Sequence, residues 1–543
     1  MGRFGLPPRL GWLRGLGLST LSAALWLSNG VTRKTVGLTF VLVAASYSSL
    51  MLWVENVWAF PHPERLLVVI AAMWVVGSLY YLAALRITRD GMAALGGALI
   101  WTFLFGTGGR LFESISPVLA GVIVLIVPVG VTVLFVRLST SRVREVVVIG
   151  VLVFLVSGPL VALVRGTIGD FSRSDVLVSD WGQPLSVELS NRPDIFLVVV
   201  DGFVGTRGLQ GTFDVDADSY LSGLEASGFE IVDSAWAPYA LSIASIPSLL
   251  EMNYLVSDSG VIGGQDFKDL GSIVSGDNAL VATLRSQGYE IVMIESGWGY
   301  SYCGNAVDQC YESAFLDEGT FFVIRESVVG PLLTRTYGNA FTVGSVGSME
   351  TLLSTAPMIS SDEIPSLVFG HLMIPHPPLY LDAQCGFVYE EDRSGWVLYG
   401  GPNSLGERMD AYIAQADCVL SFLQDLASKI DPDDVIVVVG DHGSDSANQS
   451  KTSPDSWSHA ATVERMNVLL AVRTSNLCQA ADAVVVTQVM DLVLSCLDPE
   501  HRATSEQRLF RGRILDTGEM EFVEMDGAQV SELLYPISAI KAG

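Results

Sequence analysis

The feature that most constrains this chain of 543 residues is a series of long apolar runs in its first third. A helix of about 20 apolar residues is long enough to cross the hydrocarbon core of a bilayer. A sixth, shorter run at 15–29 is rich in Gly and Ser, and we interpret it as an interfacial helix, with a sixth span as the alternative. The five longer runs lie at 35–54, 66–85, 92–109, 116–136 and 146–164. The sequence therefore predicts an N-terminal α-helical transmembrane bundle of about five spans over residues 1–165.

The basic residues between these runs predict the orientation of the bundle. Ten Lys and Arg residues precede the first span or lie in the loops on that same side, and the alternate loops hold only Arg65 and Arg110. Because basic loops stay in the cytoplasm, this bias places the N-terminus there. With an odd number of spans, residues 166–543 are then extracytoplasmic, and the protein is a multi-pass protein of the cell (plasma) membrane. A cleaved signal peptide is the alternative for the N-terminus, but no cleavage site with a polar mature start follows it.

The charge balance separates the same two parts. Residues 1–165 carry 13 Lys and Arg against 5 Asp and Glu, whereas residues 166–543 carry 18 against 53. A net charge of −35 in the second part argues against nucleic acid as a partner, because nothing there neutralises a run of phosphates. The apolar content of 50% excludes a disordered chain. We expect residues 166–192 to link the membrane to an extracytoplasmic domain over 193–543.

All six cysteines lie in this acidic part, which suits disulfide formation in an oxidising compartment. Cys303 and Cys310 are the simplest pair to propose, because they close a small loop. Six buried free thiols are the alternative, and metal binding is disfavoured because no CxxC spacing occurs.

Continuous β-branched runs alternate with helical patterns in the acidic part, and such runs are typical of a mostly parallel sheet covered on both faces. The amphipathic stretch 278–287 is one of the expected helices. The expected strands are 195–200, 290–294, 367–369, 435–439 and 468–472. The sequence therefore predicts an α/β domain whose site lies beyond the carboxyl ends of the strands.

Acidic and imidazole side chains follow these strands. Asp201 comes after the first, and Asp441-His442 comes after the run at 435–439. An Asp-Gly after a strand is usually only a turn, and a lone His is usually structural. Four of the six histidines fall in strand ends or polar loops, namely His371, His376, His442 and His459. Mixed carboxylate and imidazole ligands are what a divalent metal requires, and Asp441-His442 is the pair hardest to explain as a turn.

Five motifs occur in the order seen in the alkaline phosphatase/sulfatase superfamily, and the sequence resembles its alkaline-phosphatase-like members over roughly 193–475. The motifs are VVVDG, SIASIPSLLEMNYL, HLMIPHPPLYLD, VIVVVGDHGSD and the downstream His459…Glu464-Arg465. Within the superfamily the chain resembles the membrane-anchored, sulfatase-like branch of lipoteichoic acid synthases and phosphoethanolamine transferases. Those proteins commonly combine five spans with an exported catalytic domain.

The resemblance implies roles for single residues. Asp201 matches the first metal-binding acid, and Asp441-His442 matches the Asp-His pair of the same metal. His376 matches a histidine that binds substrate or a second metal, with His371 as a weaker companion. His459 matches a histidine or lysine found in that part of the superfamily. Whether a second metal binds stays open.

The nucleophile implied by the resemblance is Ser242. Transferases of this group carry a Thr three residues before the Ser of an S-x-P motif, and here that motif is Ser245-Ile246-Pro247. Ser245 is the alternative, because sulfatases place their formylglycine precursor there, but Leu249 stands where a sulfatase has Arg. Both serines are also compatible with capping a helix that begins near Pro247.

These residues together predict a membrane-bound metal-dependent phosphotransferase that acts on phospholipid head groups or phosphorylated cell-envelope glycans through a phosphoseryl intermediate. Asp201, Ser242, Asp441 and His442 would hold Mn²⁺ or Zn²⁺, and two carboxylates favour Mn²⁺ slightly. A hydrolase of sulfate or phosphate esters is the alternative enzyme. A catalytically inactive exported scaffold is the alternative of another class.

Overall fold

The computed structural model forms two compact units. Helices α2 to α5 and all but the first residue of α12 (Glu318–Glu326) belong to the first unit, and the strands and other helices belong to the second. The structure describes residues 30–55, 60–111, 117–138, 177–178, 181–312, 317–327, 340–361, 363–379, 381–388, 404–446, 448–474, 483–503 and 506–535.

In the described part of the first unit, four long helices are apolar, and each coincides with a predicted span. Their bounds are Gly30–Glu55 (α2), Pro63–Thr88 (α3), Gly91–Leu111 (α4) and Pro117–Leu138 (α5). Val41, Tyr81 and Leu95 pack together inside the unit, whereas Leu67 and Leu125 are exposed. This unit therefore places apolar side chains on its outside as well as in its core.

The prediction of about five spans is only partly supported. Among the described residues, one helix, Pro63–Thr88, is long and apolar enough to cross a membrane by length and composition. The described apolar stretches of the other three helices are shorter, at Gly37–Tyr47, Gly91–Gly106 and Val122–Arg137. The predicted segments 146–164 and 15–29 lie outside the described residues.

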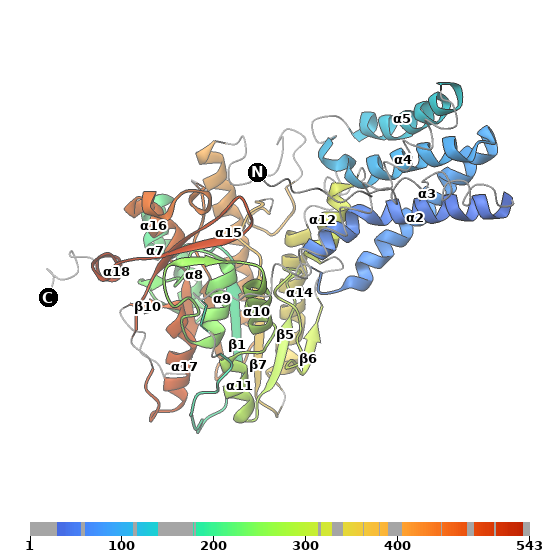
Figure 1. Ribbon diagram of the computed structural model, residues 1–543. Coiled ribbons are helices and arrows are strands. Elements are labelled where there is room, and N and C mark those ends of the chain that lie inside the picture. Colours follow the sequence, from blue (N-terminus) through green and yellow to red (C-terminus); the bar gives the residue numbers. More distant parts are fainter. Residues whose placement is uncertain are drawn as a thin grey trace, which may run out of the picture. The chain divides into compact units, whose positions relative to one another are not determined.

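A seven-stranded sheet forms the centre of the second unit (Figure 1). Its strands, in spatial order, are β2 (Glu230–Ile231), β9 (Leu470–Arg473), β8 (Val435–Gly440), β1 (Ile195–Val200), β7 (Ser366–Leu372), β5 (Glu290–Ile294) and β6 (Gln309–Tyr311). Strands β8, β1, β7, β5 and β6 are parallel, as predicted, but β9 runs antiparallel to β8 and β2 antiparallel to β9. The sheet is therefore mixed, with a parallel centre.

Helices cover both faces of this sheet, because alternate residues of its buried strands point to opposite sides. Leu197 of β1 packs in the core with α9, α10, α11 and α17, and Val198 packs in the core with α7, α8, α14 and α15 (Figure 1). The bounds are Thr206–Thr212 (α7), Ala217–Ala226 (α8), Ser242–Glu251 (α9), Gln265–Val274 (α10), Ala279–Ser286 (α11), Ala340–Ile359 (α14), Leu405–Ala427 (α15), His459–Met466 (α16), Val489–Leu497 (α17) and Gly527–Leu534 (α18). The predicted α/β fold, with helices on both faces of a central sheet, is confirmed.

Smaller elements complete the unit. They are the two-stranded sheet of β3 (Ala235–Trp236) and β10 (Val484–Val485), the three-stranded sheet of β4 (Gly260–Ile262), β12 (Met520–Glu524) and β11 (Phe510–Ile514), and the 3-10 turns η3 (Gln449–Lys451), η4 (Pro454–Ser456) and η5 (Val486–Gln488). Part of the segment 166–192 also packs here, since Val187 and Leu189 are buried in the domain core.

The predicted disulfide between Cys303 and Cys310 is present. A second joins Cys385 to Cys418, and Cys496 is also disulfide-bonded. The described cysteines are therefore oxidised, in agreement with the compartment predicted from their position in the chain.

Candidate metal and phosphoryl-transfer site

Three neighbouring strands at the centre of the sheet bring the predicted ligands together. Asp201 directly follows β1, and Asp441-His442 directly follow β8. His371 is the second-to-last residue of β7. Since the three strands are parallel and in register, their carboxyl ends meet at one edge. These four side chains are at most 2% exposed.

In each of the two carboxylates, one oxygen has a polar neighbour and the other has no hydrogen-bond partner. Asp441 Oδ1 accepts a hydrogen bond from the Gly202 amide at 3.0 Å, while Asp201 Oδ2 lies 3.4 Å from His371 Nε2. The other two oxygens, Asp201 Oδ1 and Asp441 Oδ2, are buried without a hydrogen-bond partner. Buried polar atoms are rarely left in this state, so an unpaired carboxylate oxygen on each side indicates a place for a cation.

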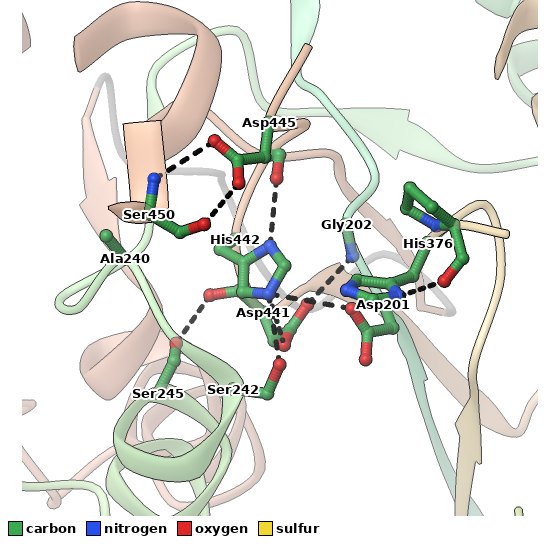
Figure 2. Close-up of polar contacts among 12 residues, drawn as sticks. Asp201, Gly202, Ala240, Ser242, Ser245, His376, Asp441, His442, Asp445 and Ser450 are labelled. Carbon is green, nitrogen blue, oxygen red and sulfur yellow. Dashed lines mark hydrogen bonds and ion pairs between the residues drawn. The ribbon is translucent and has the colours of Figure 1, made fainter. Parts of the chain in front are cut away.

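The ring of His442 completes this set. Its Nδ1 lies 2.8 Å from the carbonyl oxygen of Gly443, which can only accept, so Nδ1 carries the proton. Nε2 is then the unprotonated nitrogen that can act as a ligand, and it lies 3.6 Å from Asp201 Oδ1 and 3.5 Å from Asp441 Oδ2 (Figure 2). Burial, reinforced by Arg465, lowers the pKa of His442, which favours the neutral imidazole that a metal needs.

Asp201 is surrounded by histidines. Burial on its own raises the pKa of this carboxyl, but His376, His371 and His442 outweigh it and hold the pKa below its usual value. His371 in turn packs edge-on against Trp298, with 5.1 Å between the ring centroids. The environment therefore favours an ionised carboxylate in a place that water does not reach.

Ser242 and Ser245 both lie in α9, which begins at Ser242 and not near Pro247 as the sequence suggested. Ser242 is part-exposed at the first position of the helix, and its Oγ lies 3.0 Å from His442 Nε2 (Figure 2). Ser245 is fully buried and donates to the backbone oxygen of Asp441 at 2.5 Å. Of the two hydroxyls, that of Ser242 faces the ligand atoms at a helix N-terminus, where an anion is favoured.

The remaining two predicted residues lie differently. His376 is half-buried beside the site, with its ring centroid 6.1 Å from that of His442 and its amide bonded to the carbonyl of Asp201. His459 is exposed at the first position of α16 and lines a separate hollow of about 280 Å³ with Arg207, Trp236 and Glu532. The structure brings His376 to the ligands and does not bring His459 there.

The donor atoms present fit a divalent cation. Asp201, Asp441 and His442 offer one ligand atom each within 4.8 Å of one another, and they are the described Asp/His group that could hold a metal ion. The other described group, Glu295 with Cys303 and Cys310, consists of disulfide sulfurs and a carboxylate bonded to a backbone amide. Two carboxylates, one imidazole and a nearby hydroxyl suit a divalent cation such as Mn²⁺ or Zn²⁺.

Sequence reasoning missed the residues that hold the site loops from α15. The hydroxyl of Tyr412 accepts from the Val204 amide and donates to the Gly202 carbonyl, both at 2.8 Å. Gln415 donates to the carbonyl of His376 at 3.2 Å. In the sequence these two residues are only the inward positions of an amphipathic helix, so no local signal marks them.

No protein-family model matches the chain, and no curated protein matches it. Among solved structures it is similar to the integral membrane protein lipooligosaccharide phosphoethanolamine transferase A from Neisseria meningitidis (11% identity, TM-score 0.40, 85% of this chain and 95% of that one). It is also similar to an alkaline phosphatase superfamily protein from Vibrio parahaemolyticus (12%, 0.40, 70% and 93%) and to the zinc complex of the C-terminal periplasmic domain of EcEptC from Escherichia coli (12%, 0.39, 64% and 98%). The likeness is distant at these values, so the chemistry of the site has to follow from its own geometry. A 2-O glycosaminoglycan sulfatase is also among the similar solved structures (12% identity, TM-score 0.38, 65% of this chain and 89% of that one).

Proposed function

We propose that this protein is a membrane-bound metal-dependent phosphotransferase that acts on phospholipid head groups or phosphorylated cell-envelope glycans. The observation that carries the proposal is the convergence of three ligand atoms at the start of α9: two unpaired carboxylate oxygens, from Asp201 and Asp441, and the His442 Nε2 that contacts the hydroxyl of Ser242. A structural cluster would pair these atoms with protein donors, because an unpaired buried polar group costs about 1–3 kcal/mol.

Ser242 is the nucleophile in this proposal. A divalent cation, when bound, lowers the pKa of a nearby hydroxyl and neutralises charge on phosphate oxygens. The Ser242 Oγ forms a bond to phosphorus as the bond to the leaving oxygen breaks, and the N-terminus of α9 favours the negative phosphoryl group. Ser242 loses its proton to solvent as it attacks, and the departing oxygen takes a proton from the imidazolium of the half-buried His376. An acceptor hydroxyl then attacks the phosphoserine, gives its proton to the now neutral His376, forms the product ester and releases the Ser242 oxygen, which regains a proton from solvent.

The extracytoplasmic position of the domain is part of the proposal. It is supported by the disulfides and by the first unit, whose helices carry apolar residues on their outside. A lipid donor in the outer leaflet would lie on the same side of the membrane as such a domain. The spans themselves, the boundaries at 165 and 192 and the cytoplasmic N-terminus stay predictions.

The proposal is tested by trapping the intermediate. The full chain in nanodiscs containing phosphatidylethanolamine is incubated with Mn²⁺ or Zn²⁺, quenched in acid and analysed by peptide mass spectrometry. We expect a phosphoryl or substituted phosphoryl group on Ser242. A parallel incubation with 4-nitrophenyl phosphate and 4-nitrophenyl sulfate tests the hydrolase alternative. Sulfate release without modified Ser242 would overturn the proposal in favour of a sulfatase, and no metal binding at all would favour a scaffold.

A further inference from the structure

A buried arginine, Arg465, bridges the two loops that form the site. It lies near the end of α16 and is 3% exposed. Its Nε donates to the carbonyl of Ala240 at 2.9 Å, and its Nη1 donates to the carbonyl of Gly443 at 3.0 Å. Ala240 comes two residues before Ser242, and Gly443 directly follows His442. One guanidinium group therefore holds the nucleophile segment and the ligand segment together.

Arg465 forms hydrogen bonds with both backbone polar groups of Gly443. The amide of Gly443 donates to the backbone oxygen of Arg465 at 2.7 Å, so the same residue holds both polar groups of the glycine. A side chain at position 443 would bring a Cβ within 2.0 Å of the Glu464 oxygen, so only glycine fits this close approach. The orientation of the Gly443 carbonyl is therefore fixed by α16.

That carbonyl is also the acceptor for His442 Nδ1. Fixing it sets which ring nitrogen carries the proton and turns Nε2 toward Asp201, Asp441 and Ser242. Such outer partners orient metal-ligating histidines, and their loss typically costs 10–100-fold in metal affinity or activity. The planar guanidinium suits the task, because its donors diverge in fixed directions toward two acceptors.

Among the described residues, no acidic side chain forms a hydrogen bond or ion pair with this buried cation. In the described part of the chain, the hydrogen bonds of Arg465 go to backbone carbonyls, and the neighbouring Glu464 is occupied by Ser444, Ser446 and Gln449. Burying an arginine without an ion-paired carboxylate is costly, so its presence at this place points to a role beyond packing.

We propose that Arg465 is the positioning residue that fixes the distance between the nucleophile Ser242 and the metal-binding histidine His442. This inference rests on the proposed function, in which these two residues act together. Arg465 contacts neither substrate nor metal itself; it acts through the carbonyls of Ala240 and Gly443.

Arg473 offers a matched control for the experiment. It is also a buried arginine, 8% exposed, and its Nη atoms donate to the carbonyls of Ala427, Ile430 and Asp431. It ends β9, away from the carboxyl ends of β1 and β8. Replacing either arginine by lysine therefore removes buried guanidinium–carbonyl hydrogen bonds. Only the replacement of Arg465 removes bonds to the loops that carry Ser242 and His442.

The test compares Arg465→Lys and Arg473→Lys in the full chain, using titration calorimetry with Mn²⁺ alone and single-turnover formation of phospho-Ser242. We expect Arg465→Lys to weaken Mn²⁺ binding and slow phosphorylation about 10–100-fold, and Arg473→Lys to change both less than twofold while losing similar stability. Arg465→Gln serves as a second variant if the lysine variant does not fold.

Equal effects of the two lysine variants would overturn the inference and leave the proposed function standing, because Arg465 would then be a packing residue. Absence of Mn²⁺ and Zn²⁺ binding in the unaltered protein would overturn the proposed function, and the inference with it. The two failures are therefore distinguishable.

Discussion

Two serines three residues apart in α9 have opposite surroundings. Ser242 presents its hydroxyl to the ring of His442 from a part-exposed position, whereas Ser245 gives its hydrogen to the backbone of Asp441 inside the core. A nucleophile must be reachable by substrate and free to lose its proton. At the residue scale, this difference favours Ser242 on grounds independent of any motif.

We therefore expect Ser242→Ala to lower the rate of phosphoryl transfer by about 10³-fold or more, because the variant loses the hydroxyl that lies 3.0 Å from His442 Nε2. Mn²⁺ binding should largely remain, since three ligands are retained. Ser245→Ala should keep most activity and lose about 1 kcal/mol of unfolding free energy with its hydrogen bond. Steady-state assays and urea unfolding of both variants measure these effects. Comparable loss of turnover in both would contradict the assignment.

Asp441 and Asp445 provide a second contrast within one loop. Both are buried, but Asp445 accepts hydrogen bonds from the amide and the hydroxyl of Ser450, while Asp441 Oδ2 has no partner. Asp441→Ala should remove the metal, and Asp445→Asn should keep about one ion per chain. Elemental analysis of the purified variants gives the answer. Full metal occupancy in Asp441→Ala would disprove the ligand set.

At the element scale, α15 acts as a support for the site. Tyr412, Gln415 and Cys418 are spaced three residues apart, so they lie near one another along the helix surface. They bond respectively to the segment after Asp201, to the segment at His376 and, through the disulfide, to Cys385. One helix thus fastens two loops that carry site residues.

The two described disulfides should differ in what their removal does. The Cys385–Cys418 bridge spans 33 residues and the Cys303–Cys310 bridge spans 7. From loop closure we expect replacement of both cysteines by serine to cost about 4 kcal/mol for the longer loop and about 2 kcal/mol for the shorter. Removal of the Cys385–Cys418 bridge should also lower kcat, because this bridge fastens the segment after His376. Urea unfolding and turnover assays on both double variants measure these effects. An equal loss of kcat in the two variants would contradict the supporting role of α15.

Strands with a strong local signal could be predicted, and pairings that depend on distant contacts could not. The apolar runs at 195–200 and 290–294 predict strands, and β1 and β5 have those bounds. The antiparallel direction of β9 and the two-residue strand β2 leave no such trace. For the site, adjacency of parallel strand ends predicts that Asp201 and Asp441 meet. The placement of His459 depends on how α16 packs, which spacing does not reveal.

At the scale of the whole molecule, the charge asymmetry and the two units lead to one prediction of topology. A reporter that works only outside the cytoplasm should be active when it is fused after residue 170. The basic loops place the N-terminus in the cytoplasm, and an odd number of spans then places residue 170 outside. A matched fusion at residue 89, in a predicted cytoplasmic loop, should give the reverse result. Alkaline phosphatase and green fluorescent protein fusions report the two sides. Cytoplasmic activity at position 170 would rule out an extracytoplasmic domain.

The central position of β1 has a consequence for how this protein folds during its synthesis. Its neighbours β7 and β8 arrive far later in the chain, and the carboxylate of Asp434 that holds the amide of Asp194 lies 240 residues downstream. At roughly 5–20 residues per second of synthesis, the apolar strand β1 waits about 10–50 s for that partner. The first ligand, Asp201, is thus made early but gains its partners only when the domain is almost complete. A chain truncated before β8 would accordingly be a substrate for chaperones and proteases rather than a partly active enzyme.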